Sequence, residues 1–128
     1  MGMELINDIP HVPAAVGPYS QAVRAGGFLF CSGQIPIDPA TGKIEATDVE
    51  GQTRQVFANL EALLLAQGRS LANVVKATVF LQDMADFPKV NPLYATAFQG
   101  HKPARSTVQV AGLPLGALVE IEVIVELP

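Results

Sequence analysis

An arginine and a row of carboxylates are predicted to share one polar face of a β-sheet near the carboxyl end of the chain. Polar and apolar residues alternate along 105–110 (Arg-Ser-Thr-Val-Gln-Val) and 118–127 (Leu-Val-Glu-Ile-Glu-Val-Ile-Val-Glu-Leu). This alternation is typical of strands that bury one face. If the two strands pair with their apolar sides together, the opposite face collects five polar side chains: Arg105, Thr107, Gln109, Glu120 and Glu122.

Arg105 is the residue of this face best suited to bind a small carboxylic acid. A guanidinium group can hold a carboxylate through two parallel hydrogen bonds, and Glu120 beside it could hold a water molecule. An arginine enclosed by another subunit needs an anionic partner, because an unpaired buried charge is very costly. Two plainer interpretations stay open. The face is an ordinary solvated sheet face, or Arg105 forms a structural ion pair with Glu120 or Glu122.

The strands that position these residues follow from the same kind of pattern. Residues 19–24 and 28–32 are strand-like, with a hairpin signal at Ala25-Gly26-Gly27 between them. Residues 74–81 are rich in β-branched side chains, which favour strands. The short connector 111–117 favours antiparallel pairing of the two C-terminal strands.

Two helices are predicted from capping signals. Thr47 and Glu50 have capping-box spacing, so Thr47 is the expected N-cap of a helix that stops at Gly68. Asn91 followed by Pro92 fits an N-cap and first helical residue, which opens a second helix to about Phe98. The predicted order is β-β-β-α-β-α-β-β, an α+β mixed sheet with two helices on one face.

Length and composition exclude several classes of protein. The 128 residues favour one domain over 1–128, and 49% apolar with 16% charged residues exclude intrinsic disorder. Nucleic-acid binding is disfavoured because the net charge is -4 and the eight basic residues are scattered. The single cysteine excludes an intrachain disulfide, and no apolar run approaches the ~20 residues that span a bilayer. We expect a cytoplasmic protein, and its low charge favours a surface partly covered by other subunits.

Several separate motifs resemble the Rid (YjgF-type) family. Residues 103–113 (Pro-Ala-Arg-Ser-Thr-Val-Gln-Val-Ala-Gly-Leu), followed by Val-Glu-Ile-Glu at 119–122, are similar to the C-terminal signature of that family. The segment 14–22 (Ala-Ala-Val-Gly-Pro-Tyr-Ser-Gln-Ala), the segment 32–36 (Ser-Gly-Gln-Ile-Pro) and residues 83–91 match as well. The motifs occur in the expected order, so the resemblance covers essentially the whole chain.

The resemblance implies a fold, an assembly and an activity. The fold is chorismate-mutase-like, and three copies form a homotrimer around a central barrel, with sites in the clefts between subunits. The activity is that of a 2-iminobutanoate/2-iminopropanoate deaminase, which hydrolyses reactive enamines and imines to 2-oxo acids and ammonia. The implied partners are small 2-imino and 2-oxo carboxylic acids, and no cofactor is implied. From the residues themselves we expect no metal and no membrane, and nucleic acid is disfavoured as a partner by the net charge.

The resemblance also implies roles for seven residues. Arg105 would clamp the substrate carboxylate, the backbone of Thr107 would contact the imine nitrogen or the attacking water, and Glu120 would orient that water. The pocket would be lined by Tyr19, Ser32, Gly33 and Asn91. Thr107 stands where some members have cysteine, and the segment 99–102 is short for the family.

Other interpretations remain at this stage. The chain could be a non-catalytic protein of the same fold that binds 2-oxo acids or partner proteins, or an endoribonuclease, against which the net charge argues. Tyr19 could simply pack a hairpin, Ser32 and Gly33 could end a strand, and Glu120 could belong to a solvated face. Cys31 is expected to be a small buried hydrophobic residue rather than a nucleophile.

Overall fold

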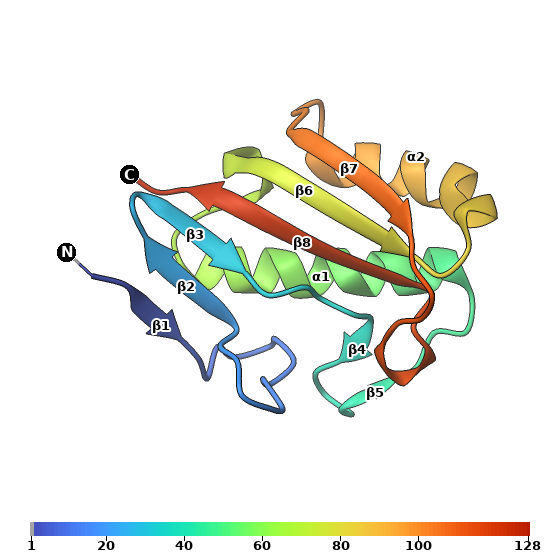
Figure 1. Ribbon diagram of the computed structural model, residues 1–128, viewed down its shortest axis with the longest axis horizontal. Helices are drawn as coiled ribbons and strands as arrows, with labels where there is room; N and C mark the ends of the chain where they lie inside the picture. Colours follow the sequence, from blue (N-terminus) through green and yellow to red (C-terminus); the bar gives the residue numbers. More distant parts are fainter. Residues whose placement is uncertain (1) are drawn as a thin grey trace.

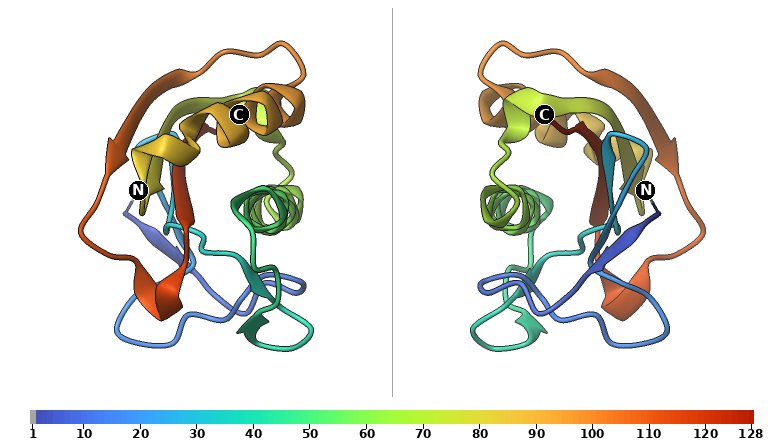
Figure 2. Two further views of the ribbon diagram at one scale, coloured as in Figure 1. Left: turned by 90° about the vertical axis from the view of Figure 1, so that its right-hand side faces the viewer. Right: turned by 90° about the vertical axis from the view of Figure 1, so that its left-hand side faces the viewer.

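The computed structural model describes residues 2–128, in which two helices cover one face of a six-stranded sheet (Figures 1 and 2). The helices are α1 (Val49–Ala66) and α2 (Phe87–Phe98). The order across the sheet is β1-β2-β3-β8-β6-β7, and only β6 and β7 pair in parallel. The predicted α+β class with a mixed sheet and two helices on one face is confirmed.

Five strands precede α1, where three were predicted. The strands of the large sheet are β1 (Glu4–Ile6), β2 (Ala22–Ala25), β3 (Phe28–Cys31), β6 (Val74–Leu81), β7 (Ala104–Gln109) and β8 (Val119–Glu126). A small second sheet joins β4 (Ile37–Asp38) to β5 (Lys43–Ile44), and single 3₁₀ turns cover Leu71–Asn73, Met84–Asp86 and Pro114–Gly116.

The core lies between the helices and the sheet face that they cover. Every second residue of β8 is buried there, and these residues are Val119, Ile121, Val123 and Val125. From α1, Val56, Leu60, Leu63 and Leu64 meet them with helical spacing and are completely buried. The other sheet face has no helix or loop layer over it (Figure 2).

The predicted pairing of the two C-terminal strands is wrong. β8 lies between β3 and β6 and pairs antiparallel with both, whereas β7 is the edge strand and pairs with β6 alone. The helix α2 carries the chain back along β6, so β7 enters parallel to β6 as in a β-α-β unit (Figure 1). The strand with four buried aliphatic residues therefore takes the central position, and the polar strand takes the edge.

Both predicted helix starts need correction. The N-cap of α1 is Asp48, not Thr47, and its Oδ1 accepts a hydrogen bond from the backbone N–H of Gly51 at 3.1 Å. The predicted stop at Gly68 is confirmed by its left-handed backbone, with φ of 67°. The helix α2 begins at Phe87, four residues before the predicted N-cap Asn91. Pro92 lies inside α2 rather than at its first residue, so its backbone donates no hydrogen bond within the helix.

No helix within residues 2–128 is long and apolar enough to cross a membrane.

Candidate active site

The strand register places Arg105 and Glu120 on opposite faces of the sheet. Arg105 is paired with Ala77 of β6, which is completely buried under the helices. Glu120 is paired with Phe80, which points to the uncovered face. The prediction that Arg105, Thr107 and Gln109 share a face with Glu120 and Glu122 is therefore wrong, because it assumed that the two strands pair with each other. The candidate site is divided into an Arg105 part and a Glu120 part.

In the Arg105 part, residues of α2 hold the guanidinium group. One nitrogen, Nη1, donates a hydrogen bond to Oδ1 of Asn91 at 2.7 Å. The guanidinium carbon lies 5.1 Å from the ring centre of Phe87 and 4.7 Å from that of Tyr94. These contacts fix a planar cation by stacking and by one hydrogen bond, which leaves other N–H groups free for a ligand.

Arg105 has no anionic partner within the described chain. The one salt bridge among residues 2–128 joins Arg24 to Glu4 at 3.7 Å. Arg105 is exposed, and its neighbour Asn91 supplies a neutral amide oxygen. The predicted alternative of a structural ion pair between Arg105 and Glu120 or Glu122 is therefore wrong for this chain.

Two buried hydroxyl groups near Arg105 have no hydrogen-bond partner in the described chain, Oγ1 of Thr107 and the phenol oxygen of Tyr94. Burial raises the pKa of Tyr94, although the charge of Arg105 acts in the opposite direction. The phenol therefore stays protonated at neutral pH. Thr107 lies on the same side of β7 as Arg105, as predicted for two residues that line one site.

A cleft of about 460 Å³ opens in front of Arg105. Its wall combines α2, through Asn91 and Tyr94, with the segment 100–103 that leads into β7. Residues 100–102 of the segment 99–102, which is short for the family, thus form part of the cleft wall. This volume suits a small organic acid.

The contacts of Arg105 with Phe87 and Tyr94 lead to a prediction about KM. Phe87→Leu should raise KM for a carboxylate substrate about three- to tenfold with a small change in kcat, because it removes one stacking contact with the guanidinium. Tyr94→Phe keeps the second ring and removes only an unpaired hydroxyl, so its KM should match the parent protein. Steady-state kinetics of both variants check this, and a larger KM for Tyr94→Phe than for Phe87→Leu would contradict it.

In the Glu120 part, the segment that follows β3 runs beside the start of β8. Gln34 and Ile121 exchange two backbone hydrogen bonds, of 2.9 and 3.1 Å, which places Gly33 against Glu120. A Cβ atom built at Gly33 would lie 2.9 Å from Cδ of Glu120 and still closer to Oε2. Gly33 therefore makes room for the carboxylate and does more than end a strand.

Ser32 connects this part to the segment around Tyr19. Its hydroxyl donates to the backbone oxygen of Ser20, and its N–H donates to the backbone oxygen of Gln21. Tyr19 is 54% exposed, so it does not pack in a hairpin as the plainer interpretation supposed. The four residues Tyr19, Ser32, Gly33 and Glu120 thus come from adjoining segments.

Partial burial raises the pKa of Glu120 above its ordinary value, and the nearby charge of Glu122 raises it further. A carboxylate with a raised pKa accepts a proton more readily, which suits a group that activates water. Burial also raises the pKa of Cys31 to about 12, so this thiol is inert at neutral pH. The interpretation of Cys31 as a buried hydrophobic residue is confirmed.

Enlarging Gly33 tests the position of Glu120. Gly33→Ala should lower kcat/KM about tenfold or more, because the new methyl group displaces the Glu120 carboxylate. Gly112→Ala is the matched control, since its Cβ would meet no atom within 4 Å and its backbone is not left-handed. Equal kcat/KM values for the two variants would show that Glu120 need not occupy its present position.

The sequence did not single out Phe87 and Tyr94, although a signal for them was present. Phe87, Asn91 and Tyr94 have i, i+4, i+7 spacing, which places them on one face of a helix. The predicted helix start at Asn91 concealed this spacing, because it left Phe87 in a separate turn.

The chain is thus a small mixed-sheet domain with an arginine cleft on one face and the half-buried carboxylate of Glu120 on the other. The chain belongs to the endoribonuclease L-PSP family, also known as the YjgF/Rid family, whose model matches residues 9–127. The resemblance seen in the sequence is thereby confirmed.

Named relatives and a solved structure agree with this assignment. A RutC family protein of Pyrococcus horikoshii is 54% identical over 89% of this chain and 90% of its own length. A mouse protein named 2-iminobutanoate/2-iminopropanoate deaminase is 49% identical over 88% of this chain and 83% of its own. The crystal structure of Escherichia coli TdcF with bound serine is 41% identical and superposes with a TM-score of 0.91, covering 98% of this chain and 100% of that one.

Proposed function

We propose that the protein hydrolyses small 2-imino acids to 2-oxo acids and ammonia. The observation that carries this proposal is the Arg105 guanidinium, which is stacked between two rings, free of any anionic partner in the chain, and open to a cleft of about 460 Å³. A free guanidinium fixed in this way is suited to a carboxylate. The names of the mouse relative and of the serine complex of TdcF support the same class of ligand.

In the proposed reaction Arg105 binds the substrate carboxylate and Glu120 orients the attacking water. A protonated imine is already a good electrophile, so neither a covalent nucleophile nor a metal is required. Water adds to C2 while one of its protons passes to Glu120, and the electrons of the C=N bond move to nitrogen. Glu120 then gives this proton to the amine nitrogen of the carbinolamine. The C–N bond breaks with its electrons on nitrogen, the hydroxyl oxygen forms the carbonyl group, and the hydroxyl proton passes to the released ammonia, which leaves as ammonium. The backbone of Thr107 would contact the imine nitrogen or the water.

We further propose that each site forms between two copies of the chain in a homotrimer. Arg105 and Glu120 lie on opposite sheet faces, so one chain cannot direct both at one small molecule. The uncovered sheet face also exposes large apolar side chains: Phe28 and Phe30 on β3 and Val108 on β7. An apolar face of this kind is typical of a surface that another subunit covers. Three sheets meeting at these faces would form the expected central barrel.

RNA cleavage, which the family description names, is less well supported. The net charge is -4, whereas RNA binding depends on basic groups that neutralise phosphates. An exposed single guanidinium in a small cleft matches one carboxylate better than a nucleic-acid chain.

A coupled assay tests the proposed activity. Threonine dehydratase releases 2-iminobutanoate, and semicarbazide traps the imine that has not been hydrolysed. The purified protein should lower the initial rate of semicarbazone formation while the total yield of 2-oxobutanoate stays constant. Calorimetric binding of 2-oxobutanoate with no effect on trapping would instead support a non-catalytic binding protein and would contradict the proposed hydrolysis.

A further inference from the structure

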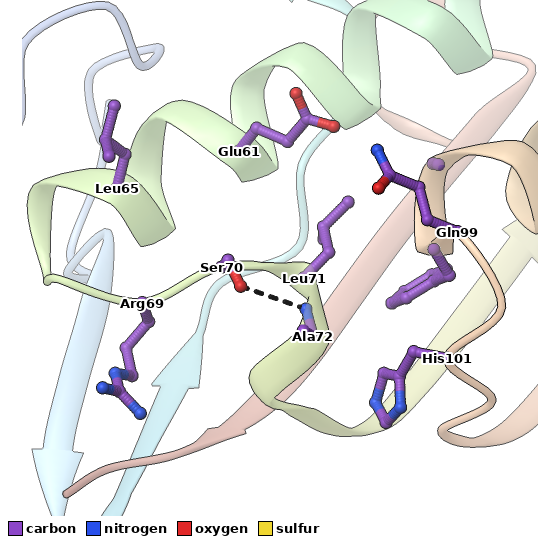
Figure 3. A pocket seen from close by; sticks show the side chains of 10 residues that line it. Glu61, Leu65, Arg69, Ser70, Leu71, Ala72, Gln99 and His101 are labelled. Atoms are coloured by element: carbon purple, nitrogen blue, oxygen red, sulfur yellow. Dashed lines mark hydrogen bonds between the residues drawn. The ribbon is translucent and has the colours of Figure 1, made fainter.

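A second pocket lies where the carboxyl ends of the two helices meet, away from Arg105 and Glu120. It has a volume of about 460 Å³ and is formed by α1, by the 3₁₀ turn Leu71–Asn73 and by the end of α2 (Figure 3). Its floor is apolar, because Leu71 and Phe98 belong to the buried core. Leu65 stands at its edge with 77% of its surface exposed. The proposed reaction uses none of these residues.

A carboxylate, an amide and an imidazole are the polar groups nearest the opening of this pocket. The carboxylate of Glu61 and the amide of Gln99 point toward one another across the opening (Figure 3). Glu61 has no cationic partner, since the one salt bridge within residues 2–128 lies elsewhere. Nε2 of His101 must donate to the carbonyl oxygen of Val74 at 2.7 Å, because a carbonyl only accepts.

The carboxyl end of α2 adds to the negative potential of Glu61, whereas two arginines lie at the end of α1: Nη1 of Arg24 donates to the side chain of Gln67, and Nε of Arg69 donates to the backbone oxygen of Gly68. Both α1 and α2 run toward the pocket, and neither has a basic residue in its last turn. A helix carboxyl end carries a partial negative charge that favours cations. Arg69 is the single arginine or lysine that lines the pocket, and it is engaged elsewhere. Its guanidinium points away from Glu61 and Gln99 (Figure 3).

We propose that this pocket binds a small organic ammonium ion that carries an aliphatic or aromatic group. The ammonium would lie at the opening, near Glu61 and the carboxyl end of α2. The apolar part would cover Leu71 and the exposed face of Leu65. The volume accommodates a ligand of this size. The site shares His101 with the wall of the carboxylate cleft, but it offers the Glu61 carboxylate in place of the Arg105 guanidinium. It does not depend on the proposed hydrolysis.

A pair of probes that differ only in charge tests the proposal. Backbone amide NMR of the full-length protein would be followed during titration with 2-phenylethylammonium, and separately with 3-phenylpropanoate. The ammonium should shift Leu71, Ala72 and Gln99, which line this pocket and not the Arg105 cleft. Followed through these three amides, it should bind more tightly than the acid. Glu61→Gln should weaken ammonium binding about fivefold, the effect of losing one exposed ion pair.

Glu45→Gln is the matched control, because it removes an exposed carboxylate that does not line this pocket. It should leave the affinity for the ammonium probe unchanged. Equal affinity for the two probes, an unchanged affinity in Glu61→Gln, or shifts confined to the uncovered sheet face would overturn the proposal.

Discussion

Arg105→Ala is expected to lower kcat/KM for 2-imino acid hydrolysis at least about a hundredfold, because it removes the guanidinium that would bind the substrate carboxylate. Arg105→Lys should recover only part of this loss. Lysine keeps the charge, but it lacks the planar fork that lies between Phe87 and Tyr94 and reaches Asn91. Kinetics with the coupled imine-trapping assay measure both variants.

Arg105→Ala should leave the fold intact. A loss of activity in this variant can then be assigned to the missing guanidinium and not to unfolding. Arg105 is an exposed residue of an edge strand, so Arg105→Ala should unfold within a few degrees of the parent protein. Arg54→Ala removes an exposed arginine of α1 and should retain full activity. If Arg105→Ala remained as active as Arg54→Ala, the assignment of the carboxylate site would be wrong.

Glu120→Gln is the second change expected to have a large effect, lowering kcat about a hundredfold or more. Glutamine keeps the size of the side chain but cannot take a proton from water. In the parent protein, kcat should fall as the pH drops through the pKa of Glu120. Because that pKa is raised by burial and by Glu122, the fall should occur above the ordinary pKa of a glutamic acid. The pH profile of kcat measures it.

The same substitution should make the protein more stable at neutral pH. The folded chain disfavours the ionised form of Glu120, so its stability decreases as the pH rises from the unfolded pKa through the higher folded pKa. The neutral side chain of Glu120→Gln avoids this cost. Its Tm should exceed that of the parent protein at pH 7 and match it near pH 3. A lower Tm at pH 7 would mean that the ionised carboxylate makes a stabilising contact in the assembled protein.

Several features of the fold could be predicted from local pattern. The strand Val74–Leu81 follows from its run of β-branched residues, and the buried face of β8 follows from strict alternation. The end of α1 follows from Gly68. In each of these cases one local signal, such as a left-handed glycine or an alternation with a period of two, is sufficient to predict the element or its end.

Strand partners could not be predicted in the same way. The connector between β7 and β8 is short, and it carries the chain past β6 as easily as it would close a hairpin. Which strands pair depends on which of them have enough apolar surface to lie at the centre of the sheet. Predicting the pairs therefore requires all the strands to be compared together. The error moved Arg105 to the wrong face. Arg105 nevertheless stayed a candidate site residue, because the motif around it does not depend on pairing.

Mixed assemblies of two inactive variants test the central claim, that a site needs Arg105 of one chain and Glu120 of another. Arg105→Ala and Glu120→Gln would be unfolded together in equal amounts, refolded, and compared with each variant treated alone. Random mixing in a closed ring leaves both groups intact at about a quarter of the sites, so activity should return to about a quarter of the parent value. A mixture no more active than its two components would contradict the shared site.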